Sequence, residues 1–157
     1  MGLGNVMAIA WDKTTTSQLH PTGHVVRPDN DGRAYVWGKF KGATTKGQPV
    51  AWKYSASTNV FIVTYAAAQQ TSVAGIAMAS AAAAGDFGWV QCGGLNRRNV
   101  SCTGTCGATT RLIWAETGKL TSVTTTATVG NWCALTTGAK SGTTLVAGRL
   151  FVYGVTI

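Results

Sequence analysis

The sequence predicts an all-β protein: a small β-sandwich or barrel with an extended N-terminal arm. Eight short runs rich in β-branched and aromatic residues follow position 34, and turns with Gly, Ser, Asn or Lys-Gly separate them. Gly is abundant at 20 of 157 residues, while only 11% of residues are charged. This composition is too apolar for a disordered chain and too poor in Leu, Glu and Lys for a helical bundle. The length fits one domain.

The first 33 residues differ in texture from the remainder. They carry clusters of Thr, Pro, Asp, Asn and Gly, and only Val25 and Val26 have strand-like character. We therefore predict an extended arm over residues 1–33 and a β-domain over residues 34–157.

The predicted strands of the β-domain are short runs with few polar interruptions. In order, they cover residues 34–40, 49–54, 59–65, 74–79, 87–92, 110–116, 121–129 and 144–157. The last run has no consistently polar face, so we expect it to be buried on both sides or to pair with another subunit.

Side-chain alternation in the first run predicts a half-buried strand. One face carries Tyr35, Trp37, Lys39 and Lys41, and the other carries Val36, Gly38 and Phe40.

The stretch between the fourth and fifth runs contains four consecutive alanines, Ala81 to Ala84. Four residues cannot nucleate a helix unaided, so we expect a loop or a single helical turn there. Residues 85–88 then predict a turn into the next strand, with the Asp86 carboxylate bonded to nearby backbone. Trp89 is expected in the core.

Charge indicates an acidic partner. The formal net charge is +8, which suits nucleic acid, an anionic membrane or an acidic protein surface. The low total charge favours a surface that another protein covers. The first residues have no basic n-region, and their apolar run is too short to cross a bilayer. We expect a protein made in a cytosol without an anchor.

The four cysteines, Cys92, Cys102, Cys106 and Cys133, do not form the two close pairs typical of a zinc site. We predict no metal ligand among them. Cys102 and Cys106 could form a disulfide across the "CTGTC" turn under oxidising conditions. Otherwise, all four act as small buried hydrophobes.

Catalytic constellations are missing from the sequence. His20 and His24 are the only histidines, and Pro21 and Gly23 between them argue against a helix that would align them. The five carboxylates are scattered: Asp12, Asp29, Asp31, Asp86 and Glu116. We predict no catalytic residue, no cofactor and no enzymatic activity.

An alternative function rests on aromatic and lysine residues that alternate along two strands. Single-strand binders on small barrels stack bases on aromatic rings and hold phosphates with Lys or Arg. The residues that would do so are Trp37, Lys39, Phe40, Lys41, Trp52, Lys53 and Tyr54. A secreted module that recognises sugar is a further alternative, and it would require oxidised cysteines.

Three stretches carry a resemblance to a known family: "SQLHPTGHVV" at 17–26, "GRAYVWGKFKGATTKGQPVAW" at 32–52 and "VAGIAMASAAAAGDFGWVQCGG" at 73–94. In this order they resemble the head decoration, or cement, proteins of tailed bacteriophages. The likeness covers roughly the first 95 residues. The sequence departs from the common pattern at Thr22 and His24, and the Thr-rich C-terminal half has no counterpart in it.

The resemblance implies a structural virion protein on the capsid surface that stabilises the capsid by bridging neighbouring major capsid subunits. The expected partners are the major capsid protein and further copies of the chain in a homotrimer, rather than a membrane or nucleic acid. The residues expected to contact the capsid are Trp11, Lys13, His20, Arg27, Lys39, Lys41, Arg97 and Arg98.

Overall fold

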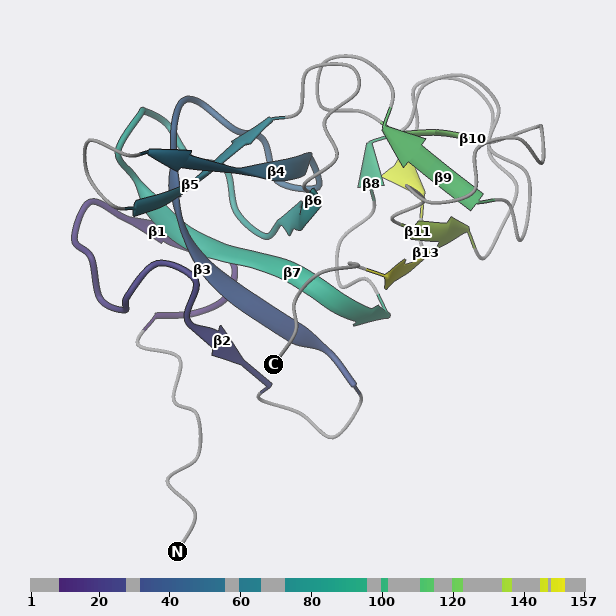
Figure 1. Cartoon of the computed structure of the whole chain (residues 1–157), viewed down its shortest axis with the longest axis horizontal. Coiled ribbons are helices and arrows are strands. Elements are labelled where there is room, and N and C mark those ends of the chain that lie inside the picture. Colours follow the sequence, from purple (N-terminus) through teal and green to yellow (C-terminus); the bar gives the residue numbers. More distant parts are fainter. Residues whose placement is uncertain are drawn as a thin grey trace, which may run out of the picture.

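A computed structural model describes residues 9–27, 32–55, 60–65 and 73–95, together with short strands in the last third of the chain. Side chains are described within 9–27, 32–52 and 74–94. The described residues form strands and turns and contain no helix (Figure 1). The all-β prediction is therefore confirmed.

The strands differ in length, and the longest, β7, lies at the centre of the sheet. In chain order they are Thr14–Thr15 (β1), Val25–Val26 (β2), Ala34–Phe40 (β3), Pro49–Ser55 (β4), Val60–Tyr65 (β5), Val73–Ala77 (β6), Phe87–Leu95 (β7), Val100–Ser101 (β8), Arg111–Trp114 (β9), Leu120–Ser122 (β10), Ala134–Thr136 (β11), Leu145–Val146 (β12) and Gly148–Phe151 (β13). The predicted strands at 34–40, 74–79 and 87–92 correspond to β3, β6 and β7.

Five strands pair in a closed ring, which makes a small barrel. β7 pairs with β6, β6 with β4, β4 with β5, β5 with β3, and β3 with β7 again. All these pairings are antiparallel except β3 with β5, which is parallel. The β3–β7 ladder sets Val36 opposite Val90 and Trp37 opposite Trp89.

Gly75 is the residue that lets β6 close this ring. Its φ is +142°, and the register of β4 against β6 shifts at the neighbouring pair. A Cβ at this position would overlap the backbone carbonyl of Gln91 on β7. Only glycine allows so close an approach of two backbones.

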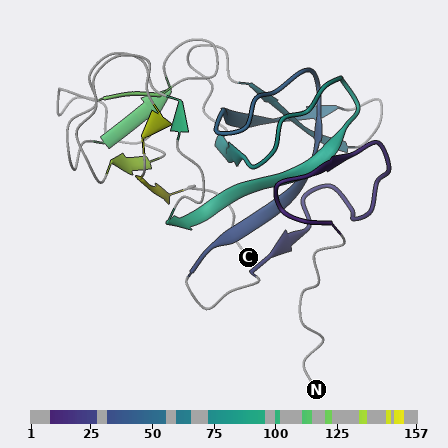
Figure 2. The same ribbon diagram turned by 180° about the vertical axis from the view of Figure 1, so that it is seen from behind.

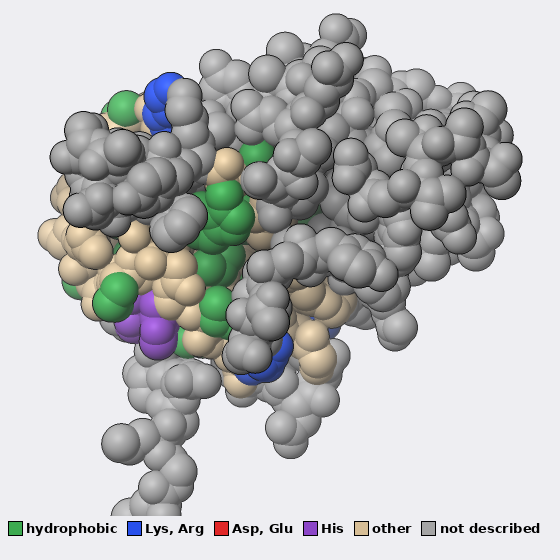
Figure 3. All heavy atoms as spheres, in the orientation of Figure 1, with side chains coloured by type: hydrophobic (Ala, Val, Ile, Leu, Met, Phe, Trp, Pro, Cys, Tyr) green, Lys and Arg blue, Asp and Glu red, His purple; other side chains and the backbone are tan. Residues whose placement is uncertain are grey.

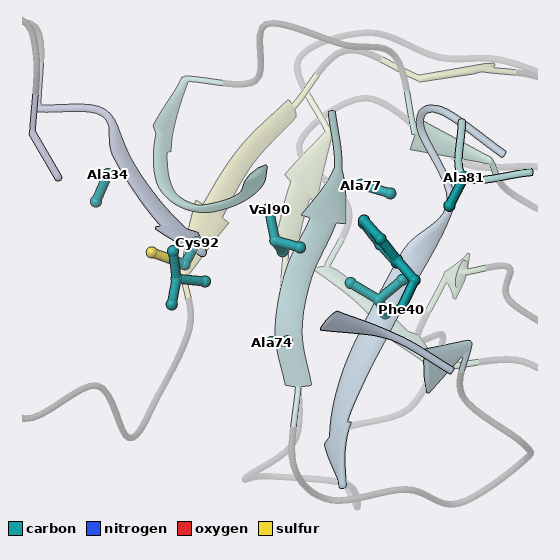
Figure 4. Packing of buried hydrophobic residues seen from close by; sticks show 9 residues of the cluster. Ala34, Phe40, Ala74, Ala77, Ala81, Val90 and Cys92 are labelled. Atoms are coloured by element: carbon teal, nitrogen blue, oxygen red, sulfur yellow. The ribbon is translucent and has the colours of Figure 1, made fainter. Parts of the chain in front are cut away.

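The inside of the ring holds an inner cluster of mostly small and aliphatic side chains from β3, β4, β6 and β7 (Figure 4). Its buried members are Ala34, Val36, Phe40, Val50, Ala74, Ala77, Ala81, Val90 and Cys92. Figure 4 shows Ala34 and Cys92 at one end of this cluster and Phe40 and Ala81 at the other.

The outside of the β3–β7 ladder holds a second, outer cluster that is mainly aromatic. Its buried members are Val26, Tyr35, Trp37, Met78, Phe87 and Trp89. The prediction that β3 is half-buried is therefore wrong, because every residue of β3 is buried except Lys39, which is partly exposed. The N-terminal segment covers the face that carries Tyr35 and Trp37.

Part of the predicted arm is thus packed on the barrel. β1 pairs with the start of β7, and β2 pairs with β3 through Val25 and Val26. Ile9 and Trp11 pack against the outer cluster. Seen from behind, the N-terminal segment crosses the start of β7 (Figure 2). The boundary at residue 33 stays a prediction.

Four of the strands after β7 extend the sheet from the far end of that strand, while β8 and β12 pair in a separate two-stranded sheet. β13 pairs with β7 at Gly93 to Leu95, and β11, β9 and β10 follow in that order. These strands are gathered beside the barrel in Figure 1. β13, within the last predicted run, pairs on both edges, with β7 and with β11.

Candidate functional site

Two surface regions gather the residues that the sequence singled out. One is the covered face of the β3–β7 ladder, where His20 lies against two tryptophans and stacks on His24. The other is the end of the barrel at which β3 ends and β7 begins. They differ in chemistry, because the first is aromatic and the second carries lysines.

The histidine pair is stacked against the outer cluster. The His20 and His24 rings are nearly parallel, with centroids 4.9 Å apart. The His20 ring centroid also lies 5.3 Å from that of Trp37 and 5.1 Å from that of Trp89. The turn at Pro21 places the pair, since His24 N–H donates to the Pro21 carbonyl. Figure 3 shows the two histidines together beside apolar side chains.

Burial beside these rings lowers the pKa of His20 below its usual value, and the nearby His24 lowers it further. The neutral ring is therefore favoured in the folded chain. Because the two histidine rings are stacked, their nitrogens do not point at a common position where a metal ion could bind. The described residues also contain no group of three His, Cys, Asp or Glu side chains that could hold a metal ion. The pair serves to hold the N-terminal segment on the barrel.

The second region, which we call the basic pole, carries four lysines on segments that are hydrogen-bonded to the loop 80–86: Lys13, Lys39, Lys41 and Lys46. Lys13, Lys41 and Lys46 are exposed. Lys39 is partly exposed, and its Nζ lies 5.6 Å from the centroid of the Phe87 ring. Basic side chains are visible at the upper left of Figure 3, at this end of the barrel.

Asp86 shapes the loop of the basic pole, as the sequence predicted. Its Oδ2 accepts hydrogen bonds from the backbone N–H of Ala82 at 3.0 Å and of Ala83 at 3.2 Å. The four alanines form a loop without a helical turn, and Ala82, Ala83 and Ala84 are exposed. This carboxylate is therefore engaged with the backbone beside the lysines.

The residues predicted to contact a capsid fall into three groups. Trp11 and His20 are partly buried against the outer cluster, and Lys13, Lys39 and Lys41 lie at the basic pole. Arg27 is exposed just after β2. Arg97 and Arg98, like Cys102 and Cys106, lie outside the described residues. Lys46 was missed, although the Lys46-Gly47 turn between two strands could have indicated it.

Two of the four aromatic residues of the nucleic-acid alternative, Trp37 and Phe40, are not available to stack on bases. Trp37 and Phe40 are fully buried, in the outer and inner clusters respectively. Trp52 is partly buried and packs against the inner cluster. The side chains of Lys53 and Tyr54 lie outside the described residues.

Cys92 is a buried free thiol in the inner cluster, and burial raises its pKa to about 11. A thiol with a raised pKa is a poor nucleophile, so Cys92 acts as a small hydrophobe, as predicted. In the part of the chain that the structure describes, no helix is long and apolar enough to cross a membrane.

The fold has a counterpart among solved structures. No family model matches the sequence, and no curated protein matches it. The chain is similar in structure to the head fiber gp8.5 N base in bacteriophage phi29, with a TM-score of 0.58 and 13% sequence identity. The match covers 76% of this chain and 94% of that chain.

This chain shares the fold of a phage head fiber base. That solved structure is of a bacteriophage head fiber base, and the sequence resemblance is to bacteriophage head decoration proteins. At 13% identity, the likeness shows the fold, and the function has to be argued separately.

Proposed function

We propose that this chain is a structural protein of a bacteriophage virion that decorates the capsid and stabilises it by bridging neighbouring major capsid subunits. The observation that carries the proposal is the fold likeness to a head fiber base, which extends over 94% of that solved chain. The sequence resemblance to head decoration proteins supports it independently.

The surface chemistry supports the same role. With 11% charged residues and a net charge of +8, the chain suits an acidic protein surface that covers part of it. A cement protein bridges subunits without covalent chemistry, and each bound copy stabilises the assembled shell by mass action. Many weak contacts repeated over a lattice add up to strong retention.

The deciding experiment is co-sedimentation of the purified chain with heads of the encoding phage that lack this protein. We expect saturable binding, with a number of bound copies per head that matches one set of equivalent positions on the capsid lattice. A single-stranded oligonucleotide serves as the comparison, because a nucleic-acid binder would lose its affinity steeply as salt rises. Binding to the oligonucleotide with no binding to heads would contradict the proposal.

Bridging is tested separately from binding. Heads with and without the protein are heated and subjected to osmotic shock, and the release of DNA is followed by dye fluorescence. A bridging protein raises the release temperature in proportion to occupancy. If the protein binds to heads but the release of DNA is unchanged, it decorates the capsid without bridging its subunits.

The expected homotrimer is tested by light scattering of the free chain and by counting copies per site on heads. A trimer gives a mass three times that of the 16.3 kDa chain. A monomer both in solution and at isolated lattice positions would contradict this part of the proposal.

A further inference from the structure

The basic pole is held by a continuous set of hydrogen bonds between three segments that are distant in sequence. Thr44 and Ala81 exchange both backbone hydrogen bonds, at 3.0 and 2.8 Å. Phe40 N–H donates to the Asp86 carbonyl at 2.7 Å, and Gly85 N–H donates to the Phe40 carbonyl at 2.8 Å. The two loops after β3 and β6 are therefore joined along their length.

Ser80 connects the third segment to this joint. The Lys46 N–H donates to Ser80 Oγ at 3.1 Å, and Thr14 Oγ1 donates to the Ser80 carbonyl at 3.4 Å. The close packing of β1 on β7 depends on Gly88, where a Cβ would lie 3.0 Å from Phe40 Cε2 and 3.2 Å from Thr14 Cγ2. Three exposed lysines thus sit on one preorganised platform.

The charges of the platform are unbalanced. It carries four lysines, whereas the acidic residues beside it are Asp12 and Asp86. The Asp86 carboxylate accepts two backbone N–H groups of its own loop, which is how that loop is held. An oxygen committed in this way competes weakly with an incoming anion for the ammonium groups.

We infer that the basic pole is the surface by which this chain docks onto an acidic protein surface. The inference rests on the proposed function and specifies its contact: the acidic surface is that of the capsid shell. A platform fixed by backbone hydrogen bonds loses little conformational entropy on binding. Lysines at the rim of such a contact speed association and set its register.

A protein fits this surface better than a nucleic acid does. The rings nearest the lysines, Phe40 and Phe87, are buried beneath the platform and offer no base a stacking face. The exposed neighbours are small instead: Ala43, Ala82, Ala83 and Ala84. Small side chains let another backbone approach closely beside the charged contacts.

Docking by this end also orients the chain. β7 begins at the basic pole with Phe87 and pairs with β13 at its other end, through Gly93 to Leu95. A nine-residue strand spans about 30 Å. With the pole on the shell, the strands β9, β11 and β13 lie away from it, beyond the other end of β7.

The test reverses charge at the pole and away from it. Lys41→Glu, Lys46→Glu and the double variant are compared with Arg27→Glu, which makes the same change of charge at an exposed site just after β2. The sequence resemblance also places Arg27 on the capsid, whereas docking by the basic pole leaves it outside the contact, so this variant separates the two expectations. Binding to heads that lack the protein is measured by co-sedimentation at low and high salt. Near-ultraviolet circular dichroism confirms that each variant is folded, as expected for exposed side chains.

We expect the double variant to bind heads at least about tenfold more weakly at low salt, with a smaller salt dependence than the wild type, and Arg27→Glu to change affinity less than about twofold. Equal binding by the wild type and the double variant would overturn the inference and leave the proposed function intact. Loss on Arg27→Glu alone would move the contact to the N-terminal segment. No wild-type binding to heads would overturn both, and binding only to a single-stranded oligonucleotide would make the pole a phosphate site.

Discussion

The two faces of the β3–β7 ladder are buried by different means. The inner face is enclosed by the ring of strands, and its cluster consists mostly of Ala and Val. The outer face is covered by the N-terminal segment, which contributes Val26 and packs Ile9 and Trp11 against large aromatic rings. Backbone pairing closes the inner face, whereas side-chain contacts largely close the outer one.

This difference teaches where the chain is easiest to open. Opening the ring breaks long ladders of strand hydrogen bonds. Lifting the N-terminal cover, residues 9–27, breaks the short pairings of β1 and β2, the backbone bonds that join Trp37 to Gly23 and His24, and the bond from Thr14 Oγ1 to Ser80. Local opening follows the least protected contacts. The outer face should therefore open first, although it buries the larger side chains.

The largest expected effect is at Trp37, in the middle of the outer cluster and fully buried. Replacing it with alanine should lower the free energy of unfolding by about 3–5 kcal/mol, because it removes a large buried ring. Chemical denaturation followed by circular dichroism measures this. The control is Val36→Ala on the inner face, expected to cost about 2 kcal/mol. If Trp37→Ala costs no more than its control, the outer cluster is not a second core.

Gly75→Ala tests the closure of the inner face. The added Cβ overlaps the Gln91 carbonyl, and the backbone conformation at φ +142° is one that other residues rarely adopt. We expect a loss of about 3 kcal/mol in the free energy of unfolding. Gly42→Ala is the matched control, because a Cβ there meets nothing within 4 Å. Similar losses in the two variants would show that β6 closes the ring without a close approach.

Trp11→Ala weakens the packing of the N-terminal segment on the outer face without changing a residue of the β3–β7 ladder. Because Trp11 is partly buried against the outer cluster, its truncation should cost about 1–2 kcal/mol. Native-state hydrogen exchange should then speed up in residues 9–27 more than in β4. Leu19→Ala is the control, since that side chain is 43% exposed and its loss should change little. Uniform exchange across the chain would contradict separate opening.

The smallest effect expected is a pH dependence of the cover. The pKa of His20 is lowered in the folded chain by burial and by His24, so the fold favours the neutral ring. Its stabilising contribution is complete above the usual value of 6.5 and is lost as the pH falls through the lower folded value. NMR titration of the His20 ring should show the lowered pKa, and His24→Gln should raise it towards the usual value. An unchanged pKa of His20 in that variant would show that His24 does not lower it.

The sequence predicted the strands better than their surroundings. Strand-forming residues at 34–40 and 87–92 are local properties, and so is the Asp86 turn, so β3, β7 and the loop before β7 were found. Burial of Tyr35 and Trp37 depends on a segment more than ten residues earlier in the chain, and alternation within one strand does not contain that information. The two aromatic rings on the face that also carries Lys39 and Lys41 were the available indication.

The sequence identified the candidate site only in part, because its assembly also depends on contacts between distant segments. Lys13, Lys39 and Lys41 were singled out by type, but their meeting with Lys46 depends on the pairing of Thr44 with Ala81, between loops far apart in sequence. Trp11 and His20 were expected on a partner, and in the folded chain they pack against the outer cluster. Whether they also reach a capsid stays a prediction.

The long strand β7 has a mechanical consequence. One of its edges is shared, in order, by β1, β6 and β13, while its other edge is paired with β3 for most of its length. A pull on β13 while the basic pole is held therefore acts along β7. The hydrogen bonds between β7 and β3 lie across that direction, so they bear the load together in shear instead of separating one at a time. A chain fixed at one end and tugged at the other would resist rupture most strongly along this axis.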